Sequence, residues 1–319
     1  MPKIVLFTAL LLLNLSAFSL PVFAQQKQFN RSETDTSISF DYMWQDSSEV
    51  AHTLHFTFEK AKLQEQFRHT KAYRKEIALR YVYIALQKEV QKISPKDAKI
   101  QIRKLPQEIQ IQVKATSGEK QKEWLDAMLQ AKEEAFDNYL NENHYNRYKS
   151  PTGEEGVKPD HTRFIKENIE LLLPVAQAIY DKLLEDSSTR AYVNLLLSWI
   201  QSIPYNPLED RLTSNGSGYL PPSDVINSNL GDCDSKAVLT AALLRSLLPK
   251  LSMVVIYLPN HAMLGASLPH REDELTVNIN GMDYLLLEPT GPALLKAGEI
   301  AESSRYFLDS GMFTHEKVP

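Results

Sequence analysis

The segment from residue 233 to residue 288 places the strongest limit on how this 319-residue chain can fold. Residues 233–248 carry apolar side chains at helical spacing, and Pro249 ends the helix that this spacing predicts. Short runs rich in β-branched and large apolar residues follow, and they predict strands joined by short links. These strands are expected at 251–258, 262–268, 274–279 and 282–288. The segment therefore predicts an α+β fold with a central helix packed on an antiparallel sheet.

The residues before this segment carry mixed patterns, and we expect an N-terminal α/β region over about 25–150. Residues 141–162 are polar and rich in turn formers, which predicts a linker or a long surface loop. The other predicted elements are a β-hairpin over 36–58, a helix from Glu59 to about Ile93, strands over 99–115, a helix from Thr116 to about Tyr139, helices over 164–184 and 189–203, and a long loop over 204–230.

The first residues of the chain indicate export. Lys3 supplies a positive charge, Ile4–Leu20 is almost continuously apolar, and Val22 and Ala24 are small residues at the positions that a signal peptidase reads. We expect cleavage after Ala24, so that residues 1–24 form a signal peptide. The alternative is an uncleaved anchor, for which the apolar run is slightly short. The expected location is periplasmic or secreted, with no stable membrane insertion after the signal peptide is removed.

The overall charge argues against one class of partner. The chain has 35 basic and 40 acidic residues and an isoelectric point near 5.9. Nucleic acids and anionic membranes are bound by basic surfaces that neutralise phosphates. We therefore expect no nucleic-acid partner. No EF-hand-like calcium loop is visible, and we expect neither a cofactor nor a metal.

Cys233 is the single cysteine of the chain. It follows Gly231 and Asp232 at the start of the predicted helix, where unpaired N–H groups and the helix dipole stabilise an anion and lower a thiol pKa. The same N–H groups can receive an oxyanion. A lone cysteine in an exported protein is either buried and inert or kept for its reactivity, and the sequence leaves both readings open.

His261 and Glu288 supply the other two groups that a cysteine hydrolase needs. His261 stands between two apolar strand-like runs, from which a strand can project its imidazole toward a helix end. Glu288 ends the apolar run DYLLLE, where a carboxylate is costly to bury unless it is paired. A structural histidine and an exposed glutamate at a strand end are the alternative readings.

Three motifs in this order resemble the transglutaminase-like superfamily, in its bacterial and archaeal cysteine-peptidase branch. They are GDCDSKAVLTAALLRSLL, NHAMLGAS and YLLLEPTGP, and WIQSIPYN precedes them. The resemblance covers about 189–295 and implies a papain-like fold. It implies that Cys233 is the nucleophile, His261 the general acid and base, and Glu288 the orienting acid. The superfamily more often has Asp at the third position.

Gln201 is the candidate oxyanion donor beside the backbone N–H of Cys233, and an ordinary helix-surface amide is the alternative. With the resemblance, the expected domains are a signal peptide (1–24), an N-terminal α/β domain of unknown role (25–150), a linker and helix (151–188), and a transglutaminase-like catalytic domain (189–319).

These features predict an exported cysteine hydrolase or acyltransferase that acts on peptide or amide bonds through a thioester at Cys233. A protease or amidase is preferred over a cross-linking enzyme, because water is the default acceptor. The expected partner is a peptide or protein substrate, with components of the cell envelope among the candidates. The alternative is a binding or scaffold module of the cell envelope in which the catalytic residues are idle.

Overall fold

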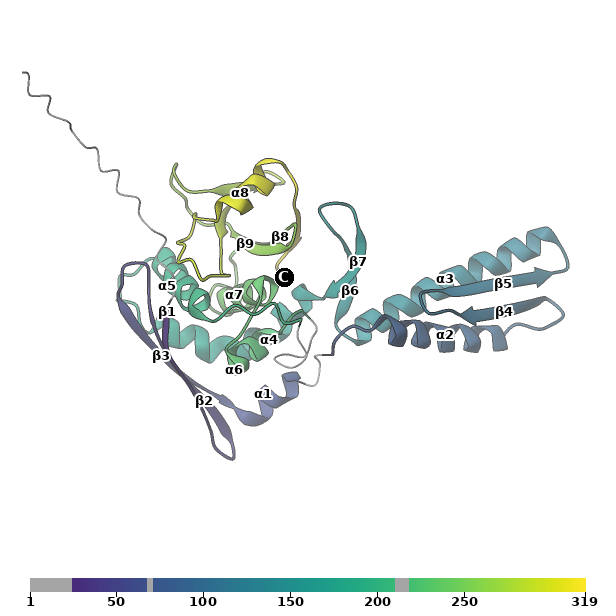
Figure 1. Cartoon of the computed structure of the whole chain (residues 1–319), viewed down its shortest axis with the longest axis horizontal. Helices are drawn as coiled ribbons and strands as arrows, with labels where there is room; N and C mark the ends of the chain where they lie inside the picture. Colours follow the sequence, from purple (N-terminus) through teal and green to yellow (C-terminus); the bar gives the residue numbers. More distant parts are fainter. Residues whose placement is uncertain (1–24, 68–70, 210–217) are drawn as a thin grey trace, which may run out of the picture.

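The computed structural model describes residues 25–67, 71–209 and 218–319, and it is a mixed α+β fold (Figure 1). The expected signal peptide, residues 1–24, lies outside the described residues. The helices are α1 (Lys60–Phe67), α2 (Lys75–Gln91), α3 (Gly118–Glu142), α4 (His161–Tyr180), α5 (Thr189–Ser202), α6 (Pro222–Ser228), α7 (Cys233–Leu247) and α8 (Glu302–Asp309). The strands are β1 (Gln25–Glu33), β2 (Ser37–Gln45), β3 (Ala51–Glu59), β4 (Ala98–Lys104), β5 (Ile109–Ala115), β6 (Tyr145–Lys149), β7 (Glu155–Pro159), β8 (Met253–Leu258), β9 (His261–Ala266), β10 (Thr276–Ile279), β11 (Met282–Leu287) and β12 (Thr314–Lys317).

The predicted helix and sheet at 233–288 are confirmed. Helix α7 packs on β8 and β9, and the sheet has the antiparallel order β10-β11-β9-β8-β12. Leu239 and Leu243 of α7 and Leu264 of β9 are fully buried in one large hydrophobic core, and side chains on the other face of the sheet, such as Ile256 and Leu286, form a separate cluster. No helix or strand is predicted for the C-terminal residues, where β12 extends the sheet on β8 and α8 also lies near β8.

The predicted hairpin at 36–58 is also confirmed as β2 and β3, with β1 as a third antiparallel strand. Alternate side chains of β2 are buried, and they face helix α5. Tyr42 meets Trp199 edge-on at 5.2 Å, and the indole N–H of Trp44 donates to Ser198 Oγ at 2.9 Å. Strands β1 to β3, expected in the N-terminal region, therefore share one core with helices α4 to α7.

The segment from α2 to α3 forms an arm that extends away from this core (Figure 1). Here α2, α3 and the hairpin β4–β5 pack on one another around two small apolar clusters of their own, which include Leu86 and Met128. The predicted strands at 99–115 and the predicted helix from Thr116 are confirmed in this arm.

Three expectations about connections are wrong. The predicted helix from Glu59 to Ile93 is two helices, α1 and α2. The segment at 141–162, expected as a linker or loop, holds the hairpin β6–β7, because Tyr145 and Val157 join the apolar cluster at the base of the arm and Gly153 turns with a φ of 89°. The expected loop at 204–230 contains helix α6, which Pro222 begins at a position where its missing N–H costs nothing.

Candidate active site

Cys233 is the first residue of α7, as the sequence predicts. Asp232 is the N-cap: its carboxylate accepts the backbone N–H of Ser235 at 3.0 Å and also the Ser235 hydroxyl. Gly231 packs so tightly that a Cβ there would lie 3.2 Å from the Lys236 side chain. Its N–H donates to Pro204 O and its carbonyl accepts the Asn206 N–H, so the segment that leads to Cys233 is tied to the chain that follows α5.

His261 and Glu288 meet at one end of the central sheet. Strand β9 begins at His261 and its antiparallel neighbour β11 ends just before Glu288, so the two side chains come to the same end of these strands. His261 Nε2 lies 2.6 Å from Glu288 Oε2. The other oxygen, Glu288 Oε1, accepts the Thr290 N–H at 3.1 Å. The carboxylate is 4% exposed and is held on both oxygens.

The Glu288 pair changes the protonation of the imidazole. Burial by itself lowers the pKa of His261, but the hydrogen bond and the charge of Glu288, together with the charge of Asp234, outweigh it and raise the pKa. The second ring nitrogen, Nδ1, takes no part in the Glu288 contact. This arrangement favours an imidazolium that is oriented by a carboxylate.

The thiol of Cys233 lies beside the start of β9. The backbone N–H of Ala262, the residue after His261, donates to the sulfur, and the thiol donates to Asp234 Oδ1 at 3.4 Å. Burial, with the charges of Asp234 and Asp232, raises the pKa of Cys233. The expectation of a lowered thiol pKa from the helix N-terminus therefore does not hold in this state, because two carboxyls stand next to the sulfur.

The structure does not support Gln201 as an oxyanion donor. Gln201 is 2% exposed, and its amide Nε2 donates to Glu288 O at 2.7 Å and to Leu295 O at 2.8 Å. Both amide hydrogens are therefore used. Gly291, with a φ of 66°, lies so close to the backbone of Gln201 that a Cβ would overlap the Gln201 carbonyl oxygen. Gln201 thus ties the chain that carries Glu288 to helix α5.

Lys236 has a similar role that sequence reasoning missed. Its side chain is fully buried, and Nζ donates to Ile203 O at 2.5 Å and to Thr290 O at 2.6 Å. Burial lowers its pKa to about 7, although the charges of Glu288 and Asp232 raise it. The lysine joins α7 to the end of α5 and to the residue that binds Glu288. Its place in an apolar helix, one turn after Cys233, is the only signal that the sequence offers.

A network of buried hydrogen bonds lies next to Asp234, the residue after Cys233, and sequence reasoning also missed it. His161 Nδ1 lies 2.8 Å from the Tyr257 hydroxyl, which donates to Glu316 Oε2 at 2.9 Å. Lys158 Nζ donates to the same Glu316 oxygen at 2.8 Å. His161 is fully buried, and its Nε2 is 3.7 Å from Asp234 Oδ2. Because these residues come from four elements, no local pattern in the sequence brings them together.

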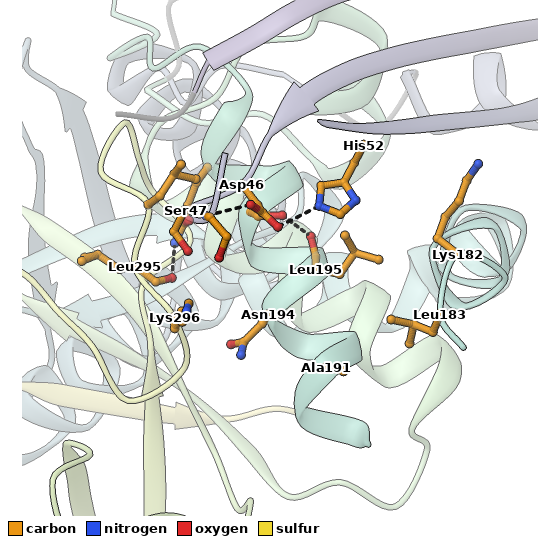
Figure 2. Close-up of a pocket in the computed structure, with 14 residues that line it drawn as sticks. Asp46, Ser47, His52, Lys182, Leu183, Ala191, Asn194, Leu195, Leu295 and Lys296 are labelled. Atoms are coloured by element: carbon orange, nitrogen blue, oxygen red, sulfur yellow. Dashed lines mark hydrogen bonds and ion pairs between the residues drawn. The ribbon is translucent and has the colours of Figure 1, made fainter. Parts of the chain in front are cut away.

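Two cavities border the region. One of about 460 Å³ is lined by His261 and Glu288 together with small and apolar residues that include Ala293, Ala301 and Phe307. The other, of about 240 Å³, lies between the turn of the β2–β3 hairpin, helix α5 and residues 294–296 (Figure 2). Gln201 lines this second cavity, whose hairpin side holds the Asp46–His52 pair at 2.8 Å. The first cavity is the one that a substrate at His261 would meet.

Comparison with known proteins provides no relative: no protein-family model, curated protein or solved structure matches this chain. Within the described residues, no helix has the length and apolar character needed to cross a membrane. The same described part of the chain holds no group of three or more His, Cys, Asp or Glu side chains arranged as a metal site.

Proposed function

We propose that this chain is an exported cysteine hydrolase of the transglutaminase-like, papain-like type, which acts on peptide or amide bonds through a thioester at Cys233. The observation that carries the proposal is the 2.6 Å contact between His261 and Glu288, next to a cysteine that begins a helix and whose sulfur accepts the Ala262 N–H. A nucleophile, a base and an acid that orients the base are the parts that acyl transfer to a thiol requires.

In the first half of the reaction, the Cys233 thiol gives its proton to Nδ1 of His261, and the resulting thiolate attacks the carbonyl carbon of the substrate. The N–H of Cys233 has no partner inside its helix, because it belongs to the first turn, and it can donate to the oxygen that becomes negative. The C–N bond then breaks, and the leaving amine takes a proton from the His261 imidazolium. The products of this half are a free amine and a thioester on Cys233.

In the second half, neutral His261 takes a proton from water, and the resulting hydroxide attacks the thioester. The C–S bond breaks, the acid leaves, and the Cys233 thiolate is restored beside a protonated His261. Glu288 holds the ring through Nε2, which leaves Nδ1 for these proton transfers. An amine in place of water would give acyl transfer instead of hydrolysis.

A binding or scaffold module of the cell envelope is the second candidate, and the raised pKa of Cys233 favours it. Burial and two neighbouring carboxyls keep the thiol protonated in this state, and a protonated thiol is a poor nucleophile. The hydrogen-bonded His261–Glu288 pair favours the enzyme, because a structural module has no need of an oriented imidazole.

The test is cleavage of a mixed peptide library by the mature protein, read by mass spectrometry, with Cys233→Ala as the matched control. We expect cleavage products from the native protein and none from the variant, together with a mass increase on Cys233 from a trapped acyl group. Equal products from both proteins, or no products at any pH between about 5 and 9, would overturn the enzyme proposal in favour of the binding module.

A further inference from the structure

The thiol of Cys233 stands next to two aspartates, Asp232 and Asp234, which by charge oppose a thiolate. A nucleophile in this position needs something that removes one of those charges. The buried chain that runs through His161 and Tyr257 ends on Asp234, and the directions of its hydrogen bonds show how this can happen.

The directions of these hydrogen bonds follow from the end of the network at Glu316. Glu316 Oε2 accepts from both Lys158 Nζ and the Tyr257 hydroxyl, so the single proton of Tyr257 is given to Glu316. Toward His161, at 2.8 Å, the Tyr257 oxygen can then only accept. His161 must therefore carry its proton on Nδ1. Burial and the charge of Lys158 lower the pKa of His161 well below its usual value, so the ring is neutral and Nε2 is a bare acceptor.

The bare nitrogen faces a carboxyl oxygen. His161 Nε2 lies 3.7 Å from Asp234 Oδ2, is fully buried and has no hydrogen-bond partner among the described residues. Two acceptors that face each other repel, and a buried acceptor without a donor destabilises the fold. A proton on Asp234 Oδ2 removes the repulsion, and an approach of about 1 Å would bring that O–H within hydrogen-bond distance of Nε2, while Oδ1 still accepts the thiol of Cys233.

The other groups that face Asp234 act in both directions. Burial raises its pKa, although 32% of its side-chain surface is exposed, whereas the Cys233 hydrogen bond and the charges of Lys158 and His261 lower it, and the net direction is upward. Asp232, on the same helix, has its own pKa raised to about 7, chiefly by burial. Among the described residues, the phenols of Tyr148, Tyr205, Tyr219 and Tyr257 are further titratable groups that feel the charge of Asp234.

We propose that His161, fixed by Tyr257 in the tautomer that has its proton on Nδ1, keeps Asp234 as a neutral carboxylic acid, and that this permits a thiolate to form at Cys233. The inference rests on the proposed function in one respect, that Cys233 is the nucleophile. In this arrangement Asp234 contacts the reacting sulfur, and His161 and Tyr257 are positioning residues that act through it. No net chemistry occurs in the chain: it sets which atom holds the proton before the substrate arrives.

The test is the rate of alkylation of Cys233 by iodoacetamide as a function of pH, followed by intact mass, in the mature protein. Asp234→Asn keeps the shape and the donor of the neutral acid, so we expect a rate at neutral pH within about threefold of the native rate. Tyr257→Phe frees the His161 tautomer to donate from Nε2, which favours an ionised Asp234. In this variant we expect the midpoint pH of Cys233 alkylation to rise by about one unit. Below the midpoint, alkylation is then about tenfold slower than in the native protein.

The double variant separates this mechanism from a packing effect. If Tyr257 acts through the charge of Asp234, Tyr257→Phe has no further effect when Asp234→Asn is present. Tyr148→Phe is the matched control, because Tyr148 packs against the Tyr257 ring at 5.7 Å and its hydroxyl is not part of the chain. An Asp234→Asn variant that reacts tenfold faster than the native protein, or a Tyr257→Phe effect that persists in the double variant, would overturn the proposal.

A second measurement covers the case in which Tyr257→Phe does not fold. At neutral pH only protonated carboxyls absorb in the carboxylic-acid carbonyl region of the infrared spectrum. We expect a band of the native protein to disappear in Asp234→Asn, and identical spectra would contradict the inference. Neither the alkylation nor the infrared measurement uses a peptide substrate. A failure to cleave peptides would therefore contradict the proposed function and would not change the result of these two measurements.

Discussion

At the residue scale, the candidate site consists of a few side chains whose protonation is set by their neighbours. Burial alone would favour neutral His261, and Glu288 reverses that preference. For Cys233, burial and two aspartates act in the same direction and favour the thiol. The candidate site thus combines an imidazole that prefers its charge and a thiol that resists ionisation. The balance between them therefore depends on the carboxyl groups of Glu288, Asp232 and Asp234.

Glu288→Gln tests the first of these groups. The amide cannot compensate an imidazolium, so we expect the pKa of His261 to fall and the rate of peptide cleavage to drop by about 100-fold or more. NMR titration of the histidine ring gives the pKa, and the cleavage assay gives the rate. Glu299→Gln, on the exposed surface near residue 296, is the control and should change neither quantity.

The same variant should alter how stability depends on pH. Because Glu288 raises the folded pKa of His261, the pair contributes stability that is fully present below the unfolded pKa of about 6.5 and is lost as the pH rises through the folded pKa. We expect the urea midpoint of the native protein to fall across this window, and a flatter profile for Glu288→Gln. Parallel profiles would mean that the pair is not formed in solution.

At the element scale, helix α7 brings its N-terminus, the capping Asp232 and Cys233 to the end of the sheet where β9 begins. The cap has two opposite effects. Its bonds to Ser235 satisfy the first turn of the helix, and its charge raises the pKa of the neighbouring thiol. The residue that best stabilises the start of the helix is therefore unfavourable for the anion at Cys233.

Asp232→Ala should separate the two effects. We expect the free energy of unfolding to fall by about 0.5–2 kcal/mol, as is typical when an N-cap is lost, and the midpoint of Cys233 alkylation to move to lower pH. Urea denaturation and the alkylation profile measure the two quantities. Ser188→Ala is a matched control, because it removes the N-cap of α5 without removing a charge near the sulfur. A thiol midpoint that stays in place would show that Asp232 does not act on Cys233 by its charge.

At the scale of the whole molecule, the chain has one main core and an arm with its own small clusters. Strands β1 to β3 share the main core with the helices around Cys233, whereas α2, β4, β5 and α3 pack mainly on one another. A change inside the arm should therefore remain local, and a change in the main core should reach the site.

Leu86→Ala and Leu197→Ala are a matched pair, since both leucines are fully buried, one in the arm and one in the main core. Each substitution should lower the free energy of unfolding of the part that contains it, the arm or the main core, by about 2–5 kcal/mol. By hydrogen exchange, we expect Leu86→Ala to increase exchange within 75–142 and to leave the rate of Cys233 alkylation unchanged. Leu197→Ala should increase exchange in β1 to β3 and in α4 to α7. If both variants increase hydrogen exchange equally in the arm and in the main core, the arm is not an independent unit.

The sequence by itself determined the elements whose patterns are local. The apolar spacing of α7 and the strands after it predicted the central helix and the sheet, and Cys233 at the helix start is visible in the order Gly231-Asp232-Cys233. A carboxylate that ends an apolar strand needs a partner, so the sequence also made His261 a reasonable partner for Glu288. Residues that act through short-range chain geometry can be found in this way.

Only the tertiary structure decided the roles of residues that act across elements. Gln201 has an amide that could serve as an oxyanion donor. Its two amide hydrogens are instead donated to Glu288 O and Leu295 O, which lie 87 and 94 residues away in sequence. Lys236 and His161 are likewise defined by partners on other elements. Their function is set by which carbonyl, hydroxyl or carboxyl comes within hydrogen-bond distance after packing, and one sequence contains no periodic signal for such distances.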